Sequence, residues 1–129
     1  MKTHLNPESL ARNPAFSQVV VVEGPAKTIY VGGQNAVLPD GTITANTLAA
    51  QARQALLNVQ AALAAAGATL KDVVRWTVAI VEGQPVREGF AAFQEAWGDA
   101  ADPPAISVHI VSGLANPRFL IEIDAIAVV

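Results

Sequence analysis

The clearest pattern of apolar and polar positions in the chain lies between Thr47 and Gly67. Asn46 or Thr47 offers a side-chain oxygen to the first free backbone N–H groups, and Gly67 tolerates the left-handed conformation that ends a helix. Apolar residues step by three or four positions along one face, namely Leu48, Ala52, Leu56, Val59, Leu63 and Ala66. The sequence therefore predicts one amphipathic helix over residues 47–67, packed on a sheet.

Runs of β-branched residues before this helix predict strands. Residues 16–23 (FSQVVVVE) and 27–31 (KTIYV) are separated by a Gly-Pro break, so we expect them to pair as a hairpin. Residues 1–13 are polar and are interpreted as a surface lead-in. A short extra strand is expected at 36–38.

After the helix, residues 73–81 (VVRWTVAIV) have the alternating pattern of a strand. A second helix is predicted to begin at Pro85 and to end at Gly98. Its apolar stripe is interpreted as core and consists of Val86, Phe90, Phe93 and Trp97. Residues 106–111 and 120–128 predict two final strands, joined by a loop. One apolar sheet face is expected to be buried under the helices or between subunits, and comprises Val74, Trp76, Val78, Val108 and Ile110.

The order of these elements predicts an α+β fold, in which a mixed β-sheet carries two helices on one face. The strands on either side of the second helix are expected to run parallel, and the hairpins at the two ends antiparallel. The length of 129 residues suits a single domain spanning 1–129.

Composition narrows the function classes. Hydrophobic residues make up 52% of the chain and charged residues only 15%, which predicts an oligomer that hides apolar surface. No uncharged apolar run is long enough for a membrane span, and the first residues lack the apolar segment of a secretory signal. There is no cysteine, so a cytoplasmic protein is expected. The net charge of −3 supplies no electrostatic footprint for nucleic acid.

Several residues are candidates for chemistry. Glu122 and Asp124 are two positions apart on a strand and so share a face, where they either face solvent or orient a water molecule. Gly33 interrupts a strand, as a bulge or as a ligand contact. Arg118 is either a solvated side chain or a source of positive charge for a site. The two histidines have no partners at metal-ligand spacing, so neither a metal nor a cofactor is expected.

Several segments together resemble the reactive intermediate deaminase (RidA, or YjgF-like) family over nearly the whole chain. They are VGGQ at 31–34, residues 49–78, FQEAW, PPAISV, and LIEIDAIAV at 120–128. The resemblance implies a chorismate-mutase-like fold and a homotrimer whose sheets line a central barrel. It also implies small-molecule clefts between subunits.

The resemblance assigns site residues one at a time. Ile106 stands where active members of the family have the arginine that holds a substrate carboxylate. Gly33 matches the ligand-contacting glycine, and Glu122 matches the glutamate that positions water. Phe16 replaces a usual tyrosine, and Phe90 replaces a polar asparagine. The site thus resembles the family's in shape, while its chemistry is altered.

Two functions follow from the resemblance. The first is a cofactor-free hydrolase of imines or enamines, acting on neutral or apolar substrates rather than on 2-aminoacrylate. Glu122 and backbone groups around Ser107 would orient the attacking water, and Val108 would line the cleft. Gly33, Ile106, Val108 and Glu122 are expected to lie together in one chain, with Phe16 and Phe90 contributed by the same chain or by a neighbour. The alternative is a non-catalytic ligand-binding or interaction protein. Ribonuclease action, attributed to some relatives, is disfavoured by the acidic pI near 5.2.

Overall fold

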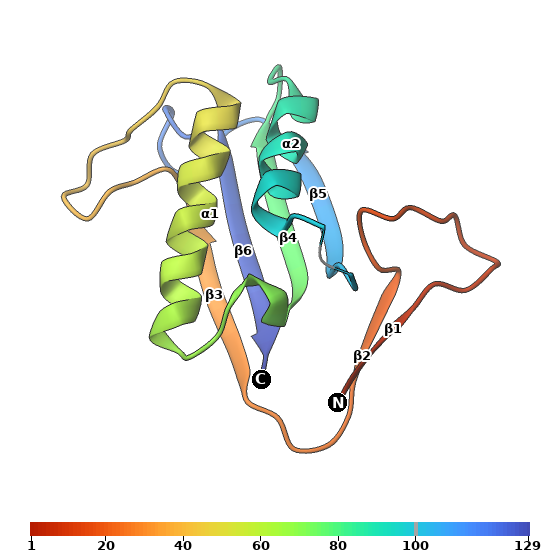
Figure 1. Cartoon of the computed structure of the whole chain (residues 1–129). Coiled ribbons are helices and arrows are strands. Elements are labelled where there is room, and N and C mark those ends of the chain that lie inside the picture. Colours follow the sequence, from red (N-terminus) through yellow and green to blue (C-terminus); the bar gives the residue numbers. More distant parts are fainter. Residues whose placement is uncertain (100) are drawn as a thin grey trace.

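A four-stranded mixed sheet, covered on one face by two helices, forms the body of the chain, and a two-stranded ribbon lies beside it (Figure 1). The structure is a computed structural model that describes residues 1–99 and 101–129. In chain order, the elements are β1 (Lys2–Leu5), β2 (Val19–Val22), β3 (Thr28–Gln34), α1 (Leu48–Ala65), the 3-10 turn η1 (Leu70–Asp72), β4 (Val73–Val81), α2 (Val86–Trp97), β5 (Ala105–Val111) and β6 (Ile121–Val128).

The strand order in the main sheet is β3-β6-β4-β5. Strands β4 and β5 are parallel and are joined through α2, as the crossover argument predicts, while β6 is antiparallel to both β3 and β4. The prediction of an α+β fold with two helices on one face is therefore confirmed. The expected antiparallel pairing of the last two strands is wrong, because β6 inserts between β3 and β4 and does not contact β5 as a neighbour.

Helix α1 is the element that the sequence pattern predicts most completely. The Thr47 side chain accepts a hydrogen bond from the N–H of Ala50, and Gly67 adopts a φ of +78° just beyond the end of the helix. The polar residue Gln51 departs from the pattern because it is buried. Its amide donates to the carbonyls of Ala45 and Arg118 and accepts from the N–H of Leu120, so all its polar atoms are satisfied.

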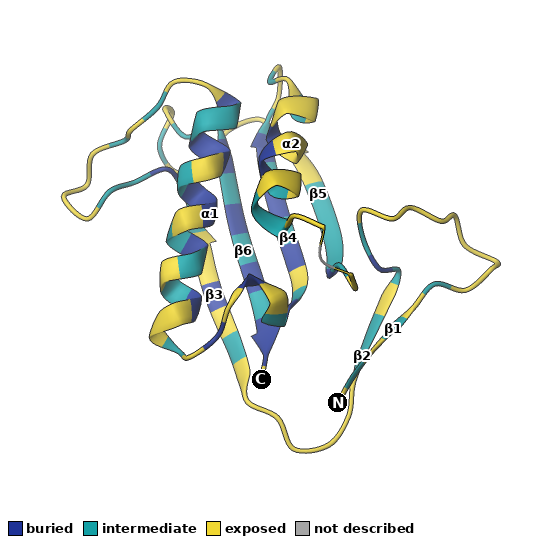
Figure 2. Cartoon of the chain, viewed as in Figure 1, coloured by how far each residue is buried: buried dark blue, intermediate teal, exposed yellow. Residues whose placement is uncertain are grey.

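The side chains between the helices and the sheet form the core, drawn dark blue on β4 and β6 in Figure 2. In β6, Ile121, Ile123 and Ala125 are buried under α1, while Glu122 and Asp124 alternate to the opposite, open face. The strand pattern therefore divides the sheet into an apolar face under the helices and a partly polar face without helices.

The predicted apolar face of β4 needs one correction. The register between β4 and β6 shifts between Val73 and Arg75, so Val73 rather than Val74 joins Trp76 and Val78 in the core. The far end of the face also differs from the prediction. Ile110, on the edge strand β5, is 56% exposed because the helices cover the middle of the sheet and leave this edge uncovered.

The N-terminal region departs most from the sequence-based prediction. Residues 2–5, interpreted as part of a lead-in, form β1, which pairs antiparallel with β2. The predicted hairpin between 16–23 and 27–31 is wrong, because β3 pairs with β6 and the Gly24-Pro25 segment is a connection between two sheets. The short strand expected at 36–38 is reduced to a single bridge between Val37 and Ile43.

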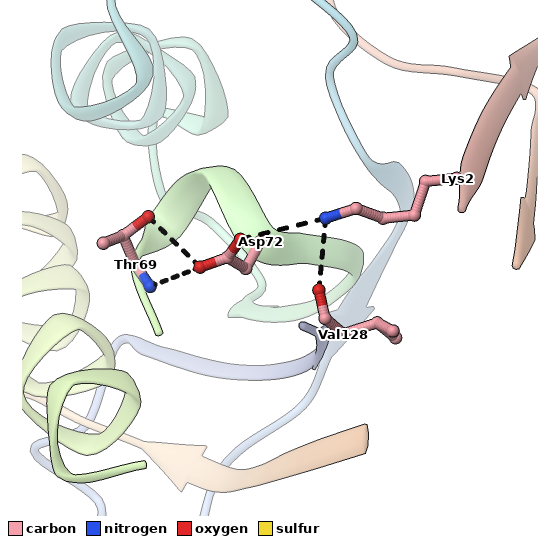
Figure 3. Close-up of polar contacts among 4 residues, drawn as sticks. All are labelled: Lys2, Thr69, Asp72 and Val128. Carbon is pink, nitrogen blue, oxygen red and sulfur yellow. Dashed lines mark hydrogen bonds and ion pairs between the residues drawn. The ribbon is translucent and has the colours of Figure 1, made fainter. Parts of the chain in front are cut away.

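Polar contacts attach the ribbon to the body of the chain (Figure 3). Lys2 Nζ lies 3.9 Å from the Asp72 carboxylate and donates to the carbonyl of Val128 at 3.2 Å. Asp72 in turn accepts a hydrogen bond from the backbone N–H of Thr69 at the start of η1. The start of the ribbon is thus tied to the turn between α1 and β4.

Within the described part of the chain, no helix combines the length and the apolar character needed to cross a membrane.

Candidate functional site

A largely apolar cavity of about 680 Å³ opens between α2, the first half of β5 and residues 13–16. Four of the residues that the sequence assigns to a site line it together, namely Phe16, Phe90, Ile106 and Val108. All four come from one chain. The aromatic stripe of α2 is thus only partly core, since Phe90 is 38% exposed and its ring forms part of the cavity wall.

Strand register places Ile106 and Val108 on the helix side of the sheet. Ile106 is paired with Trp76 and Val108 with Val78, and both partners are buried in the core. Trp76 itself lines the cavity and meets Phe93 of α2 edge-to-face, with ring centroids 5.6 Å apart and an interplanar angle of 84°. The floor of the cavity is therefore a packed part of the core.

Ser17 fixes the wall that Phe16 contributes, and sequence analysis did not identify it. Ser17 is only 3% exposed. Its hydroxyl donates to the carbonyl of Pro103, and its N–H donates to the carbonyl of Pro104. His4 Nδ1 lies 2.9 Å from the same hydroxyl oxygen. Because the hydroxyl proton is directed to Pro103, His4 supplies the proton of that contact. The signal in the sequence is weak, since one serine near a strand usually faces water.

The cavity presents no charged side chain from the residues that the structure describes. Its polar side chains are Asn13 and Gln94, both exposed at the rim. With isoleucine at position 106, the wall offers neither a guanidinium nor an ammonium group to a ligand. A carboxylate moved into this space would lose its hydration without gaining a counter-charge.

The remaining predicted residues lie on the open face of the sheet. Gly33, in the bulged part of β3, lies against Glu122, and a Cβ atom built at Gly33 would come within 2.7 Å of the carboxyl carbon. The bulge considered from sequence is thus observed, and the ligand contact at Gly33 stays a prediction. The group that approaches Gly33 is the side chain of Glu122.

Ser107 also faces this side, where its hydroxyl accepts a hydrogen bond of 2.9 Å from Arg75 Nη2. Register pairs Thr77 with both Ser107 and Asp124, so these side chains form one row across three strands. Arg75 is a site candidate that the sequence alone does not indicate. The alternating pattern of residues 73–81 places its side chain on the face opposite Trp76, but no feature of the sequence pairs it with Ser107.

The sheet thus separates the predicted site residues of one chain into two groups. Phe16, Phe90, Ile106 and Val108 lie at the cavity, whereas Glu122 lies on the other side of the strands together with Gly33 and Ser107. The expectation that Glu122 lies beside Ile106 within one chain is therefore not met. Strand parity explains this, since Trp76, which pairs with Ile106, lies beside Ala125, whereas Glu122 pairs with Ala79.

Arg118 lies at the end of the sheet remote from Ile106. Its backbone N–H donates to Asn116, and its carbonyl accepts from Gln51, in the loop just before β6. Leu120, two residues later, bonds to Val81, which is five positions along β4 from the partner of Ile106. At ~3.3 Å per residue this is ~17 Å, and Arg118 does not line the cavity of its own chain.

Among the residues that the structure describes, no three His, Asp or Glu side chains come together in a way that would hold a metal ion. His4 is engaged with Ser17, and His109 is exposed on the open face, paired in register with Ala79.

Comparisons with known proteins place this arrangement in a family. The family model described as Endoribonuclease L-PSP matches residues 7–129. A 2-iminobutanoate/2-iminopropanoate deaminase of Rattus norvegicus is 34% identical over 117 residues, which cover 88% of this chain and 80% of the relative. YyfB from Yersinia pestis, a protein of unknown function of the conserved Rid protein family, is 33% identical. Its structure has a TM-score of 0.88, over 99% of this chain and 98% of its own. The YjgF gene product of E. coli is 37% identical, with a TM-score of 0.71, over 78% of this chain and 80% of its own. The chain therefore belongs to the RidA/YjgF family.

Proposed function

We propose that this protein binds imines or enamines without a carboxylate and hydrolyses them to a carbonyl compound and ammonia, using no cofactor. The observation that carries the proposal is the uncharged cavity with Ile106 in its wall. The deaminase named for the rat relative supports the reaction type. The described lining holds no cationic side chain, which disfavours imino acids as substrates.

The separation of Glu122 from the cavity requires a second copy of the chain. We propose a homotrimer in which the open face of one copy brings Gly33 and Glu122 to the mouth of a neighbour's cavity. The exposed apolar side chains Tyr30 and Ile110 on the two edge strands support association. An obligate interface of this kind buries ~2,000 Å² or more, so dissociation should accompany unfolding. Light scattering that showed a stable monomer at micromolar concentration would reject the shared site.

The chemistry asks little of the protein beyond positioning and proton transfer. Water adds to the C=N carbon while Glu122 accepts one of its protons, and that proton passes to the nitrogen. The hydroxyl proton of the carbinolamine is then transferred, through Glu122, to the amine nitrogen, which leaves as ammonia while the carbonyl forms. Gly33 gives the Glu122 side chain the space to adopt its position.

The test compares two imine sources. An amine oxidase supplies carboxylate-free imines, an amino-acid oxidase supplies imino acids, and ammonia release is measured with and without the protein. We expect acceleration with the first source, abolished by Glu122→Gln, and little with the second. Turnover of imino acids at ~1 per second or faster would refute the proposed preference.

Ile106→Arg sharpens the same test. Hydrogen bonds to a charged group contribute roughly 1.5–3 kcal/mol each, so the variant should gain affinity for a carboxylate ligand. If Ile106→Arg binds acidic ligands no better than the wild type, position 106 does not determine the substrate class.

A second candidate function is ligand binding without catalysis. The position of Glu122 across the sheet from the cavity favours it, because no acid or base among the described residues of the same chain lines the cavity beside Ile106. In that case a ligand should bind the wild type and Glu122→Gln equally, and neither protein should release ammonia from any imine.

We propose a cytoplasmic location for either function, and the net charge of −3 continues to disfavour a nucleic-acid partner.

A further inference from the structure

We infer that the cavity selects flat, uncharged aromatic molecules over saturated molecules of the same size. This inference rests on the proposed function and names the chemical class of its ligand. It concerns binding alone, so it applies equally to the catalytic and the non-catalytic candidate.

The first argument is the arrangement of rings around the cavity. Trp76 from β4 and Phe93 from α2 form an edge-to-face pair, and three further rings line the cavity, Phe90 and Trp97 also from α2 and Phe16 from the segment before β2. Aromatic rings attract one another through their quadrupoles, in edge-to-face or offset contacts that a saturated ring does not reproduce. A flat ligand between α2 and the 13–16 segment would meet such rings on more than one side.

The second argument is the distribution of polar groups. Asn13 and Gln94 are the polar side chains of the described lining, and Asn13 Oδ1 already accepts the N–H of Ala15. Gln94 on α2 therefore offers the free amide at the rim, able to donate and accept one hydrogen bond each. A ligand with a single neutral polar substituent matches this arrangement, and a ligand with an ionised group does not.

The volume of the cavity also suits such a ligand. A cavity of about 680 Å³ is within the range of pockets that enclose small organic molecules, roughly 300–1,000 Å³. The chain therefore has space for one or two rings with a short substituent, well beyond the three-carbon skeleton of 2-aminoacrylate.

The experiment measures binding of three matched probes to the assembled wild-type protein by ligand-observed NMR. The probes are 2-phenylethanol, 2-cyclohexylethanol and phenylacetate, which differ in aromaticity or in charge. We expect 2-phenylethanol to bind roughly three- to tenfold tighter than the cyclohexyl compound, the advantage expected from one or two aromatic contacts. Phenylacetate should bind at least tenfold more weakly than 2-phenylethanol, because its carboxylate finds no partner.

Two variants test whether the cavity is responsible. Phe90→Leu keeps the wall apolar but removes a ring, so it should reduce the preference for the phenyl over the cyclohexyl probe. Leu57→Ala removes an exposed apolar side chain on α1, outside the cavity lining, and should leave that preference unchanged.

The outcomes separate this inference from the proposed function. Equal binding of the phenyl and cyclohexyl alcohols, or failure of all three probes to bind at millimolar concentration, would overturn the aromatic preference. The proposed imine hydrolysis would then still be decided by ammonia release. Tighter binding of phenylacetate than of 2-phenylethanol would overturn both, because it would reveal a cation at the site.

Discussion

The two faces of the sheet differ in what they offer a ligand. The face under the helices carries aromatic and aliphatic side chains, including Trp76 and Ile106, and encloses a cavity whose described lining has no charged side chain. The open face carries Arg75, Glu122 and Asp124 in adjacent strands. Because successive side chains of a strand point to opposite faces, the apolar surface and the acid and base groups lie on opposite sides of the same strands. In the proposed function, recognition and proton transfer are therefore divided between two surfaces, which a second copy of the chain would bring together.

The largest expected change in the free energy of unfolding comes from a substitution on the cavity face of β4. Trp76→Ala removes a buried ring from the core and from its contact with Phe93, and should lower the free energy of unfolding by ~3–5 kcal/mol. Thr77→Ala, one position along on the open face, is the matched control and should change it by less than ~1 kcal/mol. Urea unfolding of both variants measures the difference. Similar losses would show that the open face is as closely packed as the cavity face.

The next effect compares a serine beside the cavity, Ser17, with a serine on the open face of the sheet, Ser107. Ser17→Ala leaves the carbonyl of Pro103 without its donor at a buried position, and should cost ~1–3 kcal/mol. Because Ser17 holds Phe16 at the cavity, binding of 2-phenylethanol should weaken as well. Ser107→Ala removes only the contact with the exposed Arg75 and should affect neither quantity. Should the two variants unfold and bind alike, Ser17 does not position the wall.

The smallest effect on stability belongs to the two neighbouring glycines of β3. Gly33→Ala forces the flexible Glu122 side chain to move, so unfolding should change by less than ~1 kcal/mol while any ammonia release falls sharply. Gly32→Ala meets nothing within 4 Å and should preserve both stability and activity. Full ammonia release by Gly33→Ala would show that Glu122 takes no part in the reaction.

The sequence predicts those parts of the fold that depend on local periodicity. Helix α1, strand β4 and helix α2 appear within about two residues of their predicted bounds, because each has a repeating apolar pattern and clear end signals. Strand pairing is different. Nothing local tells β2 to pair with β1 rather than β3, or β6 to insert between β3 and β4, since these choices depend on contacts distant in sequence.

The candidate site divides in the same way. Four residues that the resemblance assigns to a site line one cavity, namely Phe16, Phe90, Ile106 and Val108. Glu122 faces the other side of the sheet because of how β5, β4 and β6 are paired. This register involves three strands, so the spacing of residues within one strand cannot predict it. Ser17 anchors the wall through two proline carbonyls that lie 86 and 87 residues away in the sequence. No local sequence pattern predicts a contact between residues so far apart.

The position of β6 in the sheet also bears on how the protein folds during synthesis. Strands β3 and β4 both precede it in the chain, yet neither has its antiparallel partner until residues 121–128 have left the ribosome. Until then α1, α2 and the parallel β4–β5 pair can form, but two strand edges remain unpaired and open to association with other chains. Nascent chains stalled just before Ile121 should therefore be held by chaperones and readily cut by proteases, whereas chains released after Val128 should close the sheet and resist digestion.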